Sequence, residues 1–172
     1  MPAPLVNPDN SCAFTGHRPS KLPWGFREDD PRCLALKDRL YDVVSALYGG
    51  GIRHFLCGMA LGCDQYFAEA VLALQEEHPD ITLEAAVPCE TQALHWSAEQ
   101  RARYDRLVAR CDDVTLISRD YTPTCMRDRN RYMVDRAAVL VAVYDGSRGG
   151  TQQTVDYARK LDREILLLRP AR

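Results

Sequence analysis

Ala137–Ala158, AAVLVAVYDGSRGGTQQTVDYA, decides the fold, because it combines a strand pattern, a glycine-rich turn and the start of a helix. Val139–Val143 is a continuous aliphatic run, which is typical of a strand covered on both faces of a parallel sheet. Turn-forming residues interrupt the pattern at 144–150, and Val155 and Ala158 then recur at helical spacing. The stretch therefore predicts a strand, a glycine loop and a helix in succession.

The glycine turn in this stretch is the first candidate site. Backbone N–H groups at the start of a helix have no partner inside the helix, so they can bind an anion. Gly149 and Gly150 carry no Cβ, so a phosphate can approach their backbone closely, and Thr151 adds a hydroxyl donor. Asp145 and Gly146 precede them in the same turn. The alternative is an ordinary strand-to-helix connection whose glycines only allow positive φ.

The composition indicates one globular domain. The chain has 172 residues, of which 46% are hydrophobic and 27% charged, and this suffices for one well-filled core. We expect a single domain over residues 11–172 and a loose leader over residues 1–10, which contain three prolines. The formal net charge of -2 argues against a surface that coats nucleic acid, although arginine is locally dense between Arg101 and Arg136.

Cysteines, histidines and hydropathy restrict the compartment and the cofactors. Seven cysteines are an odd number, no secretory signal begins the chain, and several cysteines fall in apolar runs. We therefore predict buried thiols in a reduced, cytoplasmic protein. There is no C-x-x-C motif and the four histidines are scattered, so we expect no metal. No apolar run approaches the roughly 20 residues that cross a bilayer, so we expect no membrane contact.

A second candidate loop follows the first predicted strand, residues 11–15. Gly16, His17 and Arg18 come directly after Thr15, at a strand end where open α/β sheets place their ligands. The imidazole and the guanidinium are suitable partners for an anion. A surface turn with a solvated histidine and arginine is the alternative.

A third candidate loop separates a predicted strand at 54–57 from a predicted helix at 65–77. Its small residues suit the close approach of a phosphate or of a ligand backbone; they are Gly58, Ala60 and Gly62. Asp64, at the start of the helix, has two interpretations. It either caps the helix or accepts hydrogen bonds from a ribose or a base.

Further segments continue the alternation of strands and helices. We predict helices over 32–48, 97–111 and 126–137, and strands over 81–87, 114–118 and 164–168. Together with the strands already named, this pattern predicts an α/β, Rossmann-like, doubly wound fold. Its sheet is expected to be mainly parallel, with about five to seven strands and helices on both faces.

The candidate loops are expected to meet, because the carboxyl ends of parallel strands lie at one edge of a sheet. Converging glycine loops predict a phosphate-binding cleft at that edge. Pro88 begins the loop after the third strand, and three polar residues lie near the start of the arginine-rich helix: Arg127, Asn130 and Arg131. The predicted ligand-binding residues are Thr15, Gly16, His17, Arg18, Gly58, Ala60, Gly62, Asp64, Pro88, Arg127, Asn130, Arg131, Asp145, Gly146, Gly149, Gly150 and Thr151.

Several stretches are specific in combination. They are FTGHRPSKLPWG from Phe14, GMALGCD from Gly58, VPCETQ from Val87, YTPTCMRDRNRYMVD from Tyr121 and VAVYDGSRGGT from Val141. Together they resemble the YpsA-like family of the SLOG superfamily, over nearly the whole chain from Cys12 onward. The resemblance implies a cytoplasmic Rossmann-like domain that binds a nucleotide or a nucleotide-derived ligand. It also relates the chain to the LOG nucleotide hydrolases and to the core of the DNA-processing protein DprA.

The LOG relatives suggest one alternative activity. Their motif P-G-G-x-G-T-x-x-E places a glutamate one helical turn beyond the threonine, whereas this chain has Thr154 at the corresponding position. We therefore expect a sensor or regulator that binds its ligand, rather than a nucleoside 5′-monophosphate phosphoribohydrolase. If the chain does cleave an N-glycosidic bond, the catalytic candidates are Asp145, Asp64 and Arg127.

The DprA relatives suggest a second alternative. They share the pattern G-x-A-x-G-x-D, seen here over 58–64, which keeps single-stranded DNA binding open. The net charge and the lack of a lysine stripe argue against DNA as the partner. The sequence leaves open the base, the number of phosphates, the pathway and a homo-oligomeric state.

Overall fold

The computed structural model describes residues 7–171. In this part of the chain the strands are β1 (Ser11–Gly16), β2 (His54–Cys57), β3 (Thr82–Val87), β4 (Asp113–Leu116), β5 (Val139–Val143) and β6 (Glu164–Leu168). The α-helices are α1 (Pro31–Gly49), α2 (Cys63–Glu77), α3 (Ala98–Ala109), α4 (Cys125–Asp135) and α5 (Gly150–Lys160). Two short 3-10 helices are η1 (Pro8–Asn10) and η2 (Pro19–Lys21).

The strands form one parallel sheet in the order β4-β3-β2-β1-β5-β6. The strand order reverses at β1, which pairs with β2 on one side and with β5 on the other. Gly16 at the end of β1 is in register with Val143 at the end of β5, so the loops that follow these two strands start side by side. Open α/β sheets bind their ligands at such a reversal, outside the carboxyl ends of the strands.

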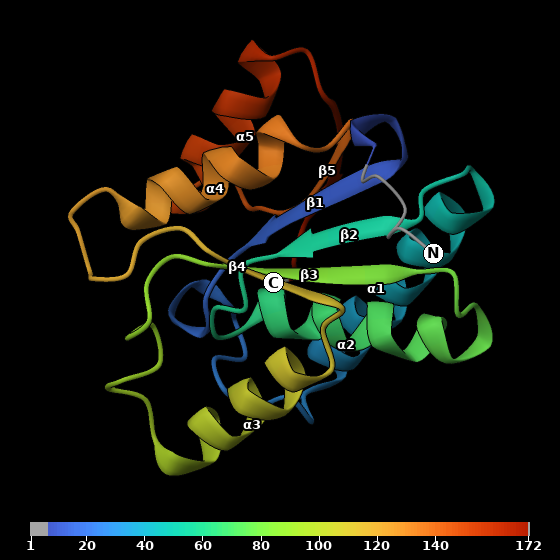
Figure 1. Cartoon of the computed structure of the whole chain (residues 1–172). Coiled ribbons are helices and arrows are strands. Elements are labelled where there is room, and N and C mark those ends of the chain that lie inside the picture. The colour runs from blue at the N-terminus through green and yellow to red at the C-terminus, as the bar shows by residue number, and fades with distance from the viewer. Residues whose placement is uncertain (1–6, 172) are drawn as a thin grey trace.

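Helices cover both faces of the sheet, with α1, α2 and α3 on one face and α4 and α5 on the other (Figure 1). Successive side chains of a strand point to opposite faces. Cys12 and Phe14 of β1 accordingly join the core beneath α1–α3, whereas Ala13 joins the core beneath α4 and α5. Because both faces are covered, β5 is buried at every position, as its aliphatic run predicted. The predicted α/β doubly wound fold is confirmed.

The predicted strands and helices lie within a few residues of the observed ones. The segment before β1 differs from the expected loose leader. Asn7 caps η1 by accepting a hydrogen bond from the Asp9 N–H at 3.0 Å. Backbone bonds from Ala138 N–H to Pro8 O (3.0 Å) and from Arg53 N–H to Asn10 O (2.8 Å) then tie residues 8–10 to the sheet. Residues 1–6 of the expected leader lie outside the described residues.

The cysteines are free thiols, and all except Cys111 are buried, which agrees with the predicted buried thiols. Burial raises the pKa values of Cys57 and Cys63 well above the ordinary value for a thiol, which makes these side chains unreactive. Between residues 7 and 171, no helix is long and apolar enough to cross a membrane. The same residues contain no group of three or more metal-ligating side chains arranged to hold an ion.

Candidate functional site

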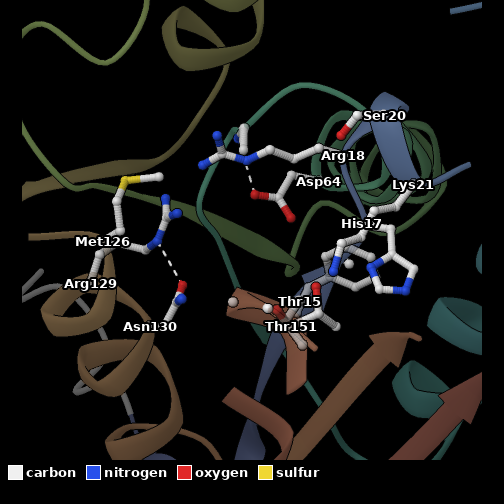
Figure 2. A pocket seen from close by; sticks show the side chains of 15 residues that line it. Thr15, His17, Arg18, Ser20, Lys21, Asp64, Met126, Arg129, Asn130 and Thr151 are labelled. Atoms are coloured by element: carbon white, nitrogen blue, oxygen red, sulfur yellow. Dashed lines mark hydrogen bonds between the residues drawn. The ribbon is translucent and has the colours of Figure 1, made fainter. Parts of the chain in front are cut away.

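A cleft of about 220 Å³ opens at the carboxyl edge of the sheet, beside the reversal of strand order at β1. The loops after β1, β2 and β5 contribute to it together with the start of α4, as Figure 2 shows. The predicted residues that line the cleft are Thr15, Gly16, His17, Arg18, Ala60, Asp64, Asn130, Gly149, Gly150 and Thr151. The parallel topology thus brings the three candidate loops together.

Positive charge predominates in the cleft. Arg18, Lys21 and Arg129 line it, against a single carboxylate, that of Asp64. Lys21 Nζ donates hydrogen bonds to Ser147 Oγ at 3.3 Å and to the Arg148 carbonyl oxygen, which hold the ammonium group against the glycine turn. Arg18 and Arg129 reach toward the same space from opposite sides (Figure 2). This arrangement suits an anion.

Arg129 is the buried cation of the cleft, with 4% of its surface exposed. Its Nη1 donates to the carbonyl oxygens of Gly58 (2.7 Å) and Ala86 (3.3 Å), and its Nε donates to Asn130 Oδ1 (2.8 Å). These partners are neutral, and among residues 7–171 no carboxylate forms an ion pair with Arg129. Burial lowers the pKa of Arg129, and the nearby charge of Asp64 offsets this effect of burial only in part. An anion in the cleft would supply the missing negative charge.

The N-terminus of α5 forms one wall of the cleft. Side chains cap α1 and α3, through Asp30 and Ser97 respectively. α5 begins directly after Gly149, whose N–H donates to Gln152 Oε1 at 3.4 Å, but Gly149 has no side chain to accept hydrogen bonds from the N–H groups that follow it. The backbone N–H groups of Gly150 and Thr151 therefore have no partner in the helix and lie at the cleft. Free N–H groups and the helix dipole both favour negative charge at this position.

Asp64 reaches the cleft from the first turn of α2. Its Oδ2 accepts a hydrogen bond from the Ala60 N–H at 3.0 Å, so the carboxylate fixes the preceding loop. It does not cap the helix, since Gly62 occupies the capping position. Burial raises the pKa of Asp64, and the Arg129 charge and the Ala60 N–H compensate only in part. Because a carboxylate repels a phosphate, a hydroxyl group is the better partner for Asp64.

Asp145 lies outside the cleft but orients His17, which lines it. His17 Nε2 lies 2.8 Å from Asp145 Oδ1 and 3.1 Å from the Asp145 backbone N, so both the side chain and the backbone of Asp145 contact this ring nitrogen. Asp145 Oδ1 also accepts a hydrogen bond from the Ser147 N–H at 2.9 Å. Hydrogen bonds from Ser147 and His17 hold the pKa of Asp145 well below its usual range. The structure gives Asp145 a positioning role toward His17, and its contact with a ligand stays a prediction.

Other predicted residues also lie outside the cleft: Gly58, Gly62, Pro88, Arg127, Arg131 and Gly146. Gly58 has a different physical reason for being glycine, because a Cβ there would overlap the Arg129 guanidinium. The Pro88 carbonyl is occupied by a hydrogen bond from the Ser118 N–H at 3.1 Å. Gly62 and Gly146 adopt positive φ in turns beside the cleft.

Helix periodicity explains which arginine of α4 lines the cleft. Cys125, Arg129 and Met133 are buried and recur every four residues, so they lie on one face of the helix, toward the sheet. Arg127 and Arg131 lie on another face and line a neighbouring pocket. The spacing from Cys125 to Met133 was readable in the sequence and identifies Arg129 as the arginine that faces inward.

The cleft also contains residues that the sequence did not indicate: Phe14, Ser20, Lys21, Met126 and Arg129. Phe14 and Met126 resemble ordinary core residues in the sequence. Lys21 reaches the glycine turn because η2 folds the chain back, with the Lys21 N–H donating to Arg18 O at 2.9 Å. No local pattern predicts that long-range contact.

Two pockets of different character adjoin the cleft. The first, which we call the aromatic flank, has a volume of about 590 Å³, shares Arg18 and Met126 with the cleft, and is lined by Leu94, His95, Trp96 and Tyr121 among others. The second, the cationic flank, has a volume of about 560 Å³, shares Asn130 with the cleft, and is lined by Arg127, Arg131 and Lys160 among others. The cleft therefore continues into an aromatic pocket and a basic one.

The fold and the cleft together define a Rossmann-like α/β protein with a basic pocket at the reversal of strand order. The chain belongs to the YspA SLOG family, because the model of that family, YpsA, matches residues 12–166. It is similar to the uncharacterized SPbeta prophage-derived protein YoqJ of Bacillus subtilis (strain 168). The two are 34% identical over 144 residues, which cover 76% of this chain and 84% of that protein.

Two solved structures of DNA processing protein A (DprA) share the fold. The protein from Streptococcus pneumoniae matches with a TM-score of 0.62 and 16% identity, over 92% of this chain and 50% of that one. The protein from Helicobacter pylori, whose structure describes a single-stranded DNA binding mode, matches with a TM-score of 0.63 and 18% identity, over 96% and 67% of the chains. This chain thus spans half the length of the Streptococcus protein.

Proposed function

We propose that this protein binds a nucleotide or a nucleotide-derived phosphate ligand in the cleft and acts as a sensor or regulator. The observation that carries the proposal is the N-terminus of α5, where Gly149 has no side chain to accept from the Gly150 and Thr151 N–H groups and where Arg18 and Arg129 line the same cleft. A phosphate at this position accepts hydrogen bonds from the Gly150 and Thr151 N–H groups and compensates the buried charge of Arg129.

Asp64 supports a phosphate ester over inorganic phosphate as the ligand. The carboxylate lines the same cleft as the three cations, and among residues 7–171 only one of its oxygens accepts a hydrogen bond, from the Ala60 N–H. A sugar hydroxyl next to the phosphate gives this carboxylate a donor and keeps the phosphate charge at a distance. The sequence resemblance to SLOG proteins supports a nucleotide as the source of that sugar phosphate.

A pair of variants at Gly150 tests the proposal. A Cβ at this position meets no heavy atom within 4 Å, so both Gly150→Asp and Gly150→Asn are expected to fold. Gly150→Asp places a carboxylate where the phosphate sits, and we expect its nucleotide affinity to fall by at least an order of magnitude more than that of Gly150→Asn. Thermal-shift titrations with a panel of mono- and dinucleotides measure this difference. Equal stabilisation of the wild type and both variants by the best ligand contradicts the proposal.

Single-stranded DNA is the second candidate ligand, and the cationic flank favours it. If a strand runs from the cleft along Arg127 and Arg131, affinity increases with oligomer length and falls steeply with salt. Replacing both arginines by glutamine then weakens the binding of a twenty-mer and leaves mononucleotide binding unchanged. Arg110→Gln at the end of α3 is a matched control. Affinity that is independent of oligomer length supports the small-ligand proposal instead.

A further inference from the structure

The aromatic flank is a pocket formed mainly by the loops after β3 and β4, and it contains the exposed ring of Tyr121 and the half-buried indole of Trp96. Trp96 packs edge-on against Tyr104, with ring centroids 5.5 Å apart and planes at 86°, so the indole is held in place at the pocket. Tyr121 and Leu94 are 70% and 55% exposed. Large apolar side chains that gather in an exposed pocket mark a surface that binds something.

The two flanks differ in chemistry, so they favour one orientation of a ligand in the cleft. The cationic flank contains Arg127, Arg131 and Lys160 and therefore suits further anionic groups. The aromatic flank suits a flat, largely apolar group with π faces, for which the indole of Trp96 and the phenol ring of Tyr121 are available. Arg18 and Met126 line both the cleft and the aromatic flank, so a group linked to the phosphate passes between them.

We infer that the aromatic flank is the nucleobase subsite of the ligand whose phosphate occupies the cleft. The inference rests on the proposed function and narrows it: the ligand is a nucleotide with an intact base, recognised by stacking, and sugar phosphates without a base bind weakly. The ribose spans the junction at Arg18 and Met126, with its hydroxyl groups toward Asp64. A purine gains more stacking area than a pyrimidine, so AMP and GMP bind more tightly than CMP.

The test compares AMP, adenosine and ribose 5-phosphate in binding titrations with the purified full chain. Wild type is expected to bind AMP more tightly than ribose 5-phosphate by on the order of ten- to a hundredfold. Tyr121→Ala and Trp96→Ala are expected to lose most of that difference without weakening ribose 5-phosphate. Tyr121→Phe keeps the aromatic ring and is therefore expected to retain the difference in affinity between AMP and ribose 5-phosphate. Phe26→Ala is the matched control, because Phe26 is 66% exposed and lies away from the cleft.

The three ligands separate failure of the inference from failure of the proposed function. If wild type binds ribose 5-phosphate as tightly as AMP, the result supports phosphate binding in the cleft and contradicts a base subsite in the aromatic flank. If adenosine binds in a manner that depends on Tyr121 while neither phosphate compound binds more tightly than adenosine, the subsite stands and the phosphate cleft is wrong. If the alanine variants weaken AMP and ribose 5-phosphate equally, with unfolding transitions like that of the wild type, the inference is overturned.

Discussion

Two carboxylates of this protein are almost equally buried, yet their environments shift their pKa values in opposite directions. Glu84 in β3 is 5% exposed and Asp64 in α2 is 7% exposed. The pKa of Glu84 is lowered from the ordinary value and the pKa of Asp64 is raised. Burial alone therefore does not distinguish a structural carboxylate from one that is available to a ligand.

Glu84 lies in a closed group of polar side chains that we call the buried network: His54, Thr82, Glu84, Thr115 and Tyr132. Its Oε1 is 2.9 Å from His54 Nε2. Its Oε2 accepts hydrogen bonds from Thr115 Oγ1 at 2.8 Å and from the Tyr132 hydroxyl at 2.6 Å. Burial by itself raises the pKa of Glu84, but the hydrogen bonds from His54, Tyr132 and Thr115 outweigh it.

At Asp64 the effect of burial on the pKa outweighs that of the hydrogen bonds and charges, which is the reverse of Glu84. The one hydrogen bond that its carboxylate accepts among the described residues comes from the Ala60 N–H, so burial prevails and the pKa is raised. The cleft around it also contains Arg129, whose charge is only partly compensated. A saturated buried network stabilises the fold, whereas an unsaturated one costs stability and remains available to bind a ligand.

The largest expected effect is the loss of stability in Glu84→Gln. A glutamine amide has one acceptor oxygen, so at least one of the three donors in the buried network loses its partner. We expect the free energy of unfolding to fall by roughly 2–3 kcal/mol, which lowers Tm by roughly 5–10 °C. Thermal denaturation measures the change, and nucleotide affinity is expected to stay the same. An unchanged Tm would show that the network is not saturated as described.

Asp64→Asn is the matched change in the cleft, and its expected effect on stability has the opposite sign. Asparagine resembles the protonated acid, which is the form that the folded protein favours when the pKa is raised. We expect Tm at neutral pH to equal or slightly exceed that of the wild type. Removing the negative charge is also expected to strengthen pyrophosphate binding by about tenfold. A loss of stability as large as that of Glu84→Gln would remove the contrast between the two sites.

Acid unfolding sharpens the comparison, because the two carboxylates contribute in opposite directions. The lowered pKa of Glu84 contributes stability above the unfolded-state value of 4.5, and this is lost as the pH falls through the folded-state pKa. The raised pKa of Asp64 contributes stability below the unfolded-state value of 3.8, and this is lost as the pH rises through the folded-state pKa.

Urea denaturation from about pH 3 to pH 7 separates the two contributions. The stability deficit of Glu84→Gln relative to the wild type is expected to shrink as the pH falls below 4.5. Any advantage of Asp64→Asn is expected to shrink over the range below the raised pKa of Asp64, as the wild-type carboxyl becomes protonated. Differences that do not vary with pH contradict both assignments.

The last prediction is that the protein does not hydrolyse the N-glycosidic bond of nucleotides, so no measurable effect is expected in this assay. Thr154 replaces the glutamate of the LOG motif, and its hydroxyl donates to Gly150 O at 2.9 Å. A neutral hydroxyl is a poor substitute for a carboxylate in stabilising the positive charge that develops on the ribose. Incubation with AMP, GMP and CMP, followed by chromatography of the free base, is expected to show binding without turnover. Turnover that disappears in Asp64→Asn would identify Asp64 as a relocated catalytic acid.

Much of the fold was readable from local sequence. The run Val139–Val143 is aliphatic throughout because both faces of β5 are covered, and the alternation of such runs with helical patterns predicted the parallel sheet. Once the strands are parallel, their carboxyl ends share an edge, so the meeting of Gly16, Ala60 and Gly150 in one cleft was also predictable.

Other features of the site depend on contacts between distant parts of the chain. Gly58 was predicted to approach a ligand, and the structure shows that its lack of a Cβ also makes room for Arg129, 71 residues later in the sequence. Asp145 was predicted as a ligand-binding residue, and the structure shows that it also holds His17, which is 128 residues away. A glycine or an aspartate has the same local signature in either role, so the sequence pattern could not separate them.

The sequence by itself determined the α/β architecture and the edge of the sheet at which the glycine loops meet, because periodicity and turn chemistry act over a few neighbouring residues. The tertiary structure decided which charges are compensated. Glu84 and Asp64 are both acids next to or within apolar segments of the sequence, and only the folded chain gives one of them three donors from other elements and the other a single N–H. Hydrogen bonding and desolvation depend on the atoms within a few ångströms in space, and distant parts of the chain supply most of those atoms.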